Sequence, residues 1–460
     1  MENKPATCPR QRAALHVAAA VTLLIVTALP VNAQSFATLF DFDVTHGASP
    51  YDSLVQGKDG NLYGTTYEGG KTNQGTVFRI APDGTFTLLR SFNGRNGRNP
   101  TAWLIPGNNA GLYGTVYVGG VNDNGTVFRM APNGGVTTLY NFSGSDGSQP
   151  QAGLTLGNDG NFYGTTRMGG ANNYGSVFQI TPAGSLTTLH SFDLTDGESP
   201  IAGLTLGNDG SFYGVTWTGA NFDGTAFKIT PSGAFSTLVN FDGTNGSGPV
   251  GNLLLGNDGN FYGTAGNGGV NNLGTVFRMT PAGVLKVLHS FRTNEGTGPS
   301  AGLALGSDGN FYGVATYGGA NGIGTLIEIT TTGHFTILHT FTTPDGENPI
   351  GIVQNTNGLF YGTAMSGGSQ GKGTLFSLDM GLAPFVIVQP ISANIGKRVE
   401  VLGQGFTATT AVLFNGTSAR FKVISDTYLT VVVPKGATTG PVTVGTPNGS
   451  FTSNRNFQVQ

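Results

Sequence analysis

The sequence predicts an all-β protein, with a seven-bladed β-propeller at residues 34–381 followed by a small β-sandwich at residues 384–460. A Tyr-Gly pair recurs every 49 or 50 residues, each repeat holds four short runs of strand-forming residues, and nothing after residue 33 has a sustained helical period. The tyrosines of the repeated pair are Tyr63, Tyr113, Tyr163, Tyr213, Tyr262, Tyr312 and Tyr361.

Residues 1–33 are predicted to be a secretory signal peptide. Lys4, Arg10 and Arg12 form a basic start, an apolar run follows, and small residues around Ala33 close the segment. A signal anchor that stays in the membrane is the alternative. Cleavage would remove Cys8, the only cysteine, so the exported chain would have no disulfide and no thiol chemistry.

Composition and charge narrow the classes of partner. Glycine accounts for 76 of 460 residues, and charged residues for 10% where about 25% is usual. The formal net charge of −3 becomes −5 when three basic residues and Glu2 leave with residues 1–33. The sequence has no basic stripe and no second apolar run of membrane-spanning length. We therefore expect a soluble, exported monomer that does not bind nucleic acid.

The third repeat shows how one unit is built. Its four predicted strands read AGLTLG, NFYGTT, GSVFQI and SLTTLHSF, with Val, Ile, Phe, Tyr and Thr dominant. Tight turns, NDG and TPAG, follow the first and third strands, and Asp-Gly is a strong hairpin signal. In a propeller these turns share one face, here called the tight-turn face. The loops after the second and fourth strands share the other, the longer-loop face.

The ends of the repeat array favour a closed ring over an open solenoid. The chain after residue 33 begins with a lone fourth strand, SFATLFDF at 35–42, and the seventh unit stops after its third strand, GTLFSL at 373–378. An N-terminal strand that completes the last blade would leave no open edge. A solenoid would instead need atypical capping repeats, which the sequence does not show.

The stretch GNDGNFYGTTRMGGANNYGSVFQITPAG and its copies, over about residues 36–380, resemble the Gly-rich GloVer repeat of bacterial choice-of-anchor proteins. The resemblance implies an extracellular location and, in many members, a C-terminal anchor or sorting signal. This chain ends NRNFQVQ without a hydrophobic tail, so that anchor is not expected. The family carries no assigned catalytic residues, and none is transferred.

Residues 384–460 change in composition and read as alternating strands at sandwich spacing. They resemble the IPT/TIG type of immunoglobulin-like domain, which implies an accessory or spacer role, sometimes with protein or glycan contacts. The residues that carry the likeness are Gly403, Gln404, Gly405, Phe406, Phe414, Asn415, Gly416, Thr417, Ala419, Val433, Pro434 and Gly440.

The loop after each fourth strand follows a Phe-x4-Gly-x2-Pro frame. The residue before its glycine suggests a calcium site, because oxygen ligands recur at this position. Three of these seven residues are not carboxylates, and the acidic spacing of a calcium loop is missing. We expect turn chemistry and neither metal nor cofactor. The seven residues are His46, Asn96, Asp146, Asp196, Asn245, Glu295 and Asp345.

The loop after each second strand carries the candidate ligand-binding residues. Large side chains beside a Gly-Gly loop offer flat, amphipathic faces that stack on sugar rings or grip a protein. The alternative is that they only pack between blades. The candidates are Tyr67, Tyr117, Arg167, Trp217 and Tyr317.

Two other patterns are given structural interpretations. His190, His289 and His339 occupy the same fourth-strand position, so they are expected on the surfaces of separate blades, too far apart to share a metal. Residues 367–371, GGSQG, match the hydrolase G-x-S-x-G pattern but belong to a repeated Gly-rich loop without the strand-to-helix elbow.

These observations predict an exported, non-catalytic binding or scaffold protein that presents its loops to extracellular polysaccharide or to a cell-surface protein. One alternative is a polysaccharide lyase or glycosidase, for which Asp193, Asp196, Glu198 and Asp223 form the densest acidic patch. The other is a purely structural envelope component.

Overall fold

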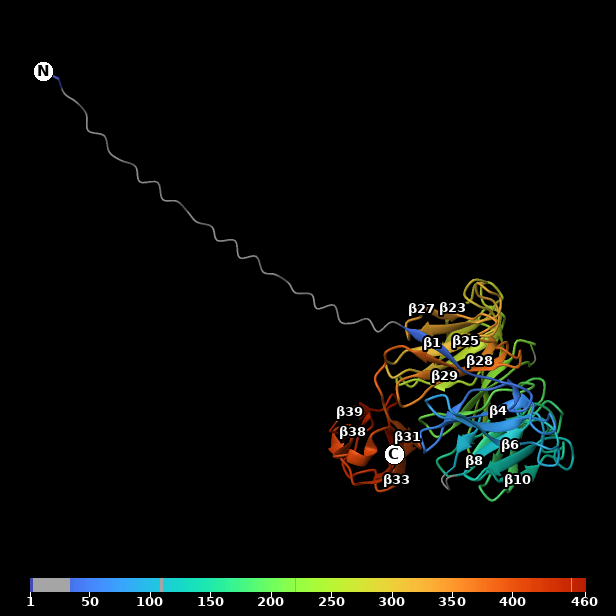
Figure 1. Ribbon diagram of the computed structural model, residues 1–460. Coiled ribbons are helices and arrows are strands. Elements are labelled where there is room, and N and C mark those ends of the chain that lie inside the picture. The colour runs from blue at the N-terminus through green and yellow to red at the C-terminus, as the bar shows by residue number, and fades with distance from the viewer. Residues whose placement is uncertain (3–33, 108–110, 220, 448) are drawn as a thin grey trace. The chain divides into compact units, whose positions relative to one another are not determined.

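The computed structural model describes residues 1–2, 34–107, 111–219, 221–447 and 449–460. Apart from its first two residues, the predicted signal peptide lies outside the described residues. Residues 34–460 form one unit (Figure 1), and its described part is built of β-strands with one short 3-10 helix, η1 (Phe406–Ala408). The all-β prediction is confirmed.

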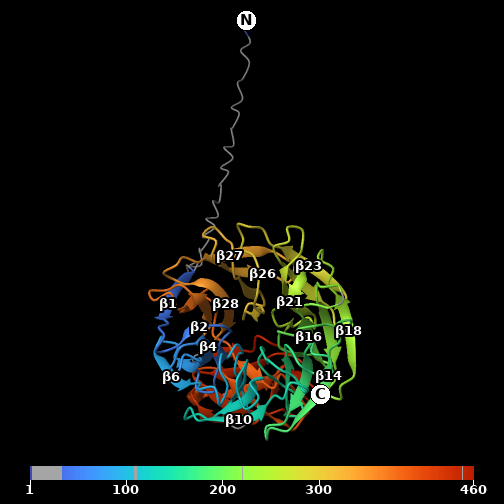
Figure 2. The same ribbon diagram turned by 90° about the vertical axis from the view of Figure 1, so that its right-hand side faces the viewer.

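Seven antiparallel sheets follow one another around a ring in the described part of residues 34–380 (Figure 2). The first three sheets contain β2 (Ala48–Pro50), β3 (Val55–Gln56), β4 (Leu62–Glu68), β5 (Thr76–Ile80) and β6 (Phe86–Ser91); β7 (Ile105–Pro106), β8 (Leu112–Val116), β9 (Thr126–Met130) and β10 (Val136–Asn141); and β11 (Thr155–Leu156), β12 (Phe162–Thr166), β13 (Ser176–Ile180) and β14 (Leu186–Ser191).

The next three sheets repeat this plan. They contain β15 (Thr205–Leu206), β16 (Phe212–Thr216), β17 (Thr225–Ile229) and β18 (Phe235–Asn240); β19 (Ser247–Pro249), β20 (Leu254–Leu255), β21 (Phe261–Asn267), β22 (Thr275–Met279) and β23 (Leu285–Ser290); and β24 (Ala304–Leu305), β25 (Phe311–Ala315), β26 (Thr325–Ile329) and β27 (Phe335–Thr340).

The last sheet is completed by the first strand of the chain. β28 (Glu347–Gln354), β29 (Phe360–Ser366) and β30 (Thr374–Asp379) are followed in the sheet by β1 (Ser35–Asp41). β1 runs antiparallel to β30, from Ser35 opposite Asp379 to Asp41 opposite Thr374. The staggered ends of the repeat array predict this pairing, and it leaves β30 with a partner on both sides.

The repeated phrase GNDGNFYG encodes both a turn and a contact between sheets. Asp159 accepts hydrogen bonds from the Asn161 backbone N–H at 3.1 Å and from the Tyr163 hydroxyl at 2.8 Å. Burial, with the Asp159 hydrogen bond, raises the pKa of Tyr163 to about 12, so the phenol stays protonated. Its ring lies 4.0 Å from the ring of Phe212 in the next sheet. Asp and Tyr are therefore repeated together because one holds the other against the neighbouring blade.

The histidines of the fourth strands also lie between sheets. His190 stacks on Phe235 of the next sheet at 3.8 Å and pairs with Asp196 at 2.8 Å. His289 and His339 make the same kinds of contact. They lie on separate blades, as predicted, but the prediction that they are surface residues was wrong: about a fifth or less of each side chain is exposed.

The residues after 384 form a separate sandwich around its own core, which includes Val401, Phe414, Leu429 and Val444. Its strands are β31 (Ile387–Gln389), β32 (Ser392–Ala393), β33 (Arg398–Leu402), β34 (Ala411–Phe414), β35 (Thr417–Ser418), β36 (Phe421–Ser425), β37 (Tyr428–Val432), β38 (Val442–Thr446), β39 (Gly449–Thr452) and β40 (Gln458–Val459).

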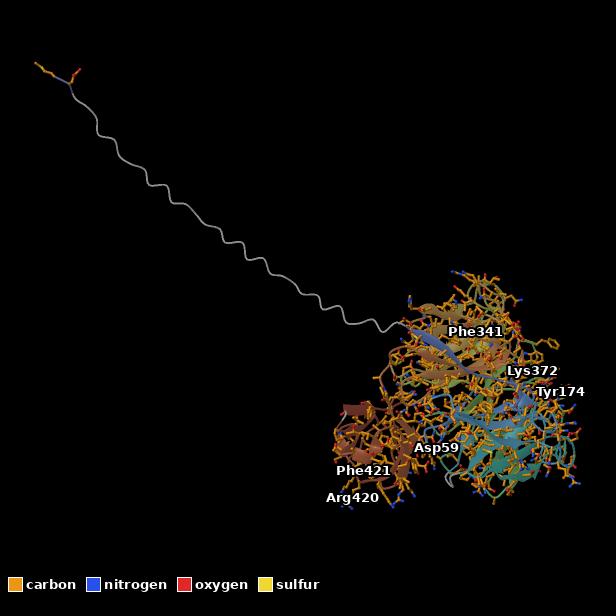
Figure 3. All side chains as sticks on the ribbon, in the orientation of Figure 1. Asp59, Tyr174, Phe341, Lys372, Arg420 and Phe421 are labelled. Atoms are coloured by element: carbon orange, nitrogen blue, oxygen red, sulfur yellow. The ribbon has the colours of Figure 1, made fainter. Side chains whose placement is uncertain are left out.

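This C-terminal domain packs on the tight-turn face. Lys58, in the turn between β3 and β4, pairs with Glu400 at 2.6 Å, and the Lys58 carbonyl accepts a hydrogen bond from Thr427. Figure 3 labels Asp59 of the same turn beside the domain. The equivalent turns of other blades make hydrogen bonds of their own, Asn158 with Ser392 and Asn257 with Asn456. The first residue of the NDG turn, or the lysine that replaces it, thus contacts the C-terminal domain in three blades.

Candidate binding cavity

A cavity of about 700 Å³ lies where the innermost strands of the ring converge. Its wall includes β3, β7, β11, β15, β20 and β24, and the C-terminal domain closes its end on the tight-turn face through residues 387–391 and 453–457. At the other end, Tyr51 and Tyr317 line the cavity, and 51% of Tyr317 is exposed. The cavity therefore opens on the longer-loop face, and its size is that of small-molecule pockets.

The indole of Trp103 lies along this wall. Other repeats have glycine at the equivalent position, including Gly153 and Gly203, and a Cβ at either glycine would collide with the Trp103 ring. The two glycines give the indole room to lie across the innermost strands of the next two blades. The ring offers a flat aromatic surface inside the cavity, of the kind that stacks on sugars.

Asp52 is the only carboxyl group that lines the cavity in the described residues. It stands where several other repeats have alanine: its backbone carbonyl accepts a hydrogen bond from Thr363, as that of Ala102 does from Thr65. The carboxylate accepts from the backbone N–H groups of Ser53 at 2.6 Å and Trp103 at 2.8 Å. Burial outweighs these two bonds and raises the pKa of Asp52 to about 7.

Arg455 is the cationic side chain among the described residues that line the cavity. It enters from the C-terminal domain, beside Leu255 and Gly256 at the tight-turn end of β20. Within the described residues its guanidinium has no ion-pair partner, and loss of hydration lowers its pKa. The positive charge of this half-buried side chain is therefore partly removed from water and is not neutralised by a described carboxylate.

Of the five predicted ligand-binding residues, Tyr317 lines the described cavity, and three others lie near enough to Tyr51 at its mouth to contact it or to interact with it electrostatically. Tyr67 packs on Tyr51 with ring centroids 5.7 Å apart, and Arg167 donates a hydrogen bond to the Tyr117 hydroxyl at 3.2 Å. Burial raises the pKa of Tyr51, with smaller contributions from the phenols of Tyr317, Tyr67 and Tyr117. These residues come from four different repeats. The loops therefore converge on one place, although some of their contacts are with each other.

Trp217 is not placed in that group. It is 41% exposed, and its indole lies against Gly248 at the start of the next sheet. This contact between blades fits the packing alternative for Trp217, while the exposed part of the ring is free to meet solvent.

Three residues of the acidic patch already have hydrogen-bond or ion-pair partners within the protein. Asp196 accepts a hydrogen bond from the Asp193 backbone N–H and pairs with His190, while Glu198 accepts one from the Thr218 hydroxyl. Hydrogen bonds from Thr195 hold the pKa of Asp193 below its usual value. The described residues contain no cluster of three or more His, Cys, Asp or Glu side chains suited to a metal. Nor do they contain a helix long and apolar enough to cross a bilayer.

Family comparison agrees with the repeat architecture. The Gloeobacter/Verrucomicrobia repeat matches residues 25–222 and 206–417, and the IPT/TIG domain matches residues 387–459. The chain belongs to the Gloeobacter/Verrucomicrobia repeat family. The predicted resemblances to this repeat and to the IPT/TIG domain are thereby confirmed. No curated protein matches the sequence.

Among solved structures, this repeat protein is similar to a fungal alcohol oxidase of the AA5 family in complex with copper. The TM-score is 0.50 at 11% identity, over 93% of this chain and 98% of that one. A gluconolactonase from Xanthomonas campestris is also similar, with a TM-score of 0.41 at 13% identity, over 76% of this chain and 90% of that one. At these identities the likeness concerns fold alone, and that of the oxidase supports the propeller.

The sequence prediction missed Tyr51, Asp52, Trp103 and Arg455. A signal for Asp52 and Trp103 exists, because the first two repeats read YDSL and TAWL where the third, fourth and sixth read QAGL, IAGL and SAGL. Those departures fall in the segments that lead into the innermost strands β3 and β7, and these segments line the cavity. Arg455 has no such signal, since its position depends on how the C-terminal domain docks.

Proposed function

We propose that this protein is an exported, non-catalytic binding protein that takes a carbohydrate at the mouth of the propeller cavity. The observation that most directly supports this proposal is that side chains from four repeats lie near Tyr51 beside the cavity opening. They are Tyr67, Tyr117, Arg167 and Tyr317. Aromatic faces bordered by hydroxyl and guanidinium groups suit the apolar faces and hydroxyls of sugars. The repeat and IPT/TIG families support an extracellular binding or scaffold role.

A binding role is favoured over glycoside cleavage by the count of carboxyl groups. Glycosidases generally place two carboxyl groups across the scissile bond, about 5–10 Å apart. Of the described residues that line this cavity, Asp52 alone carries one. A pKa of about 7 would suit Asp52 to proton transfer, but the described cavity lining has no second carboxyl group to complete a pair.

The test is a binding screen of residues 34–460 on polysaccharide and glycan arrays. A Tyr67→Ala/Tyr317→Ala variant removes two aromatic faces of the mouth, and Trp217→Ala tests the candidate outside that group. Ile424→Ala is the control, because Ile424 is 52% exposed on the C-terminal domain.

We expect a saturable glycan signal that falls at least tenfold in the double variant and stays unchanged in Ile424→Ala. A signal that survives in the double variant would reject the mouth as the site. A blank array, with capture of an envelope protein instead, would reject a carbohydrate ligand in favour of a protein partner.

A further inference from the structure

The floor of the cavity holds a cation without a counter-ion. The Arg455 carbonyl accepts a hydrogen bond from the Ser453 hydroxyl at 2.6 Å, which fixes the backbone, but no described carboxylate lies within ion-pair distance of its guanidinium. A charge that has lost part of its hydration and has no counter-ion destabilises the folded chain. Such a group is expected where something else supplies the opposite charge.

Asp52 does not supply it. Its carboxylate is bonded to the backbone of Ser53 and Trp103, and the raised pKa has no contribution from Arg455. Asp52 lies toward the mouth, whereas Arg455 lies beside Leu255 and Gly256, about four strand residues deeper. At about 3.3 Å per residue, the two backbone levels differ by roughly 13 Å.

The wall between these levels is suited to a ring. The Trp103 indole lies over Gly153 and Gly203, and the residues below it that line the cavity include Ile105 and Leu254. A ligand that reaches the floor therefore passes an aromatic face and an apolar belt before it meets a positive charge.

We propose that Arg455 binds the anionic group of an acidic sugar residue that enters from the mouth and lies against Trp103. The inference rests on the proposed carbohydrate function and specifies its substrate class: a carbohydrate whose terminal residue carries a carboxylate or a phosphate. A guanidinium matches either group with two parallel N–H donors, whereas a neutral sugar leaves the charge unpaired. The C-terminal domain then contributes to the binding site as well as closing the cavity.

The experiment is isothermal titration calorimetry on residues 34–460 with three matched probes. The probes are a glucuronate-terminated oligosaccharide, its carboxyl-reduced counterpart, which ends in glucose, and the same oligosaccharide ending in glucose 6-phosphate. The variants are Arg455→Gln and Arg455→Lys, with Arg420→Gln as the control. Arg420 is an exposed arginine of the same domain, and Figure 3 shows it at the end of that domain away from the propeller.

We expect at least tenfold tighter binding of one acidic probe than of the reduced probe. Arg455→Gln should abolish that difference, Arg455→Lys should retain part of it, and Arg420→Gln should leave it intact. Quenching of tryptophan fluorescence by the acidic probe, absent in Trp103→Phe, would place the ring inside the cavity. The better of the two acidic probes distinguishes a carboxylate from a phosphate.

Equal binding of the acidic and reduced probes, or an unchanged difference in Arg455→Gln, would overturn the inference while leaving the carbohydrate function in place. The Tyr67→Ala/Tyr317→Ala variant tests the proposed function separately. If the mouth is the carbohydrate site, this variant should lose binding of every probe, including the reduced one. The melting temperature checks folding: because the guanidinium has no protein partner, Arg455→Gln should melt no lower than the parent. A large fall would instead make Arg455 a structural residue and contradict the proposal.

Discussion

The two faces of the propeller differ in how much their loop sequences vary from blade to blade. The tight-turn face repeats nearly the same phrase in each blade, and the C-terminal domain covers it. The longer-loop face varies from blade to blade, and the cavity opens there between Tyr51 and Tyr317. Repetition in this molecule goes with contacts inside the protein, and variation goes with the face on which the cavity opens.

The first prediction concerns a glycine of the repeated blade sequence. A Cβ on Gly164 would lie 2.6 Å from the Phe178 ring and 2.9 Å from Leu154, both in the buried centre of the blade. We expect Gly164→Val to lower the free energy of unfolding by about 3 kcal/mol in urea titrations, because the core is overpacked. Gly135→Ala, at an exposed glycine without a positive φ, should stay within about 0.5 kcal/mol. Similar values for both would contradict the assigned frame.

A second prediction concerns the covered face. Lys58→Asn gives the first turn the sequence of the third, fourth and fifth blades and removes the ion pair with Glu400 and the contact over the Tyr428 ring. We expect a loss of about 1–2 kcal/mol, since both partners of the pair are mostly buried. A double-mutant cycle with Glu400→Gln measures the coupling between the two side chains. The same change on the open face, Lys71→Asn, serves as the control, and an equal effect there would remove the distinction between the faces.

The third prediction follows from the cavity carboxyl group. The folded pKa of Asp52, about 7, lies above its ordinary value of 3.8. Between those values the folded chain holds a proton that the unfolded chain has lost, so this group lowers stability as pH rises from about 4 to 7. The stability of Asp52→Asn relative to the parent should therefore increase between pH 5 and pH 8.

Asp83→Asn provides the matched comparison in the same urea titrations. Hydrogen bonds from Thr85 hold the pKa of Asp83 below 3.8, so its carboxyl is ionised in both states at both pH values. Its effect should be the same at pH 5 and pH 8. A relative stability for Asp52→Asn that is flat across this range would mean that Asp52 is better hydrated than its position indicates.

The smallest effect is expected on the open face. Val270 is 90% exposed in the loop after β21, and Val270→Ser should change the free energy of unfolding by less than about 0.5 kcal/mol. Calorimetric melting measures it. A clear loss of stability would show that exposed residues of the longer loops also contribute to the stability of the blades.

The sequence predicted the architecture well because each blade contact is encoded locally. Asp159 and Tyr163 lie four residues apart, and together they build the turn and the packing on the next blade. The stack of His190 on Phe235 was missed because it joins residues 45 apart whose proximity depends on blade geometry. The docking role of Lys58 was missed for a related reason: its partner Glu400 lies 342 residues away and comes near only when the C-terminal domain docks.

The candidate site was predicted only at its rim. Tyr67, Tyr117, Arg167 and Tyr317 stood out as large residues in variable loops, and the structure brings them together. The interior required knowing which strand faces the cavity, after which Asp52 and Trp103 become visible as departures from the repeat. Whether these residues bind a ligand stays a prediction.

The pairing of β1 with β30 joins residues 344 positions apart, at Ser35 and Asp379. During synthesis the first strand emerges hundreds of residues before its partner and must wait with an unpaired edge. Closing a loop of this length carries an entropic cost on the order of 5 kcal/mol, which is recovered only when the last strand docks. Assembly of the ring should therefore finish late and in one step, with the earliest segment of the chain among the last to find its place.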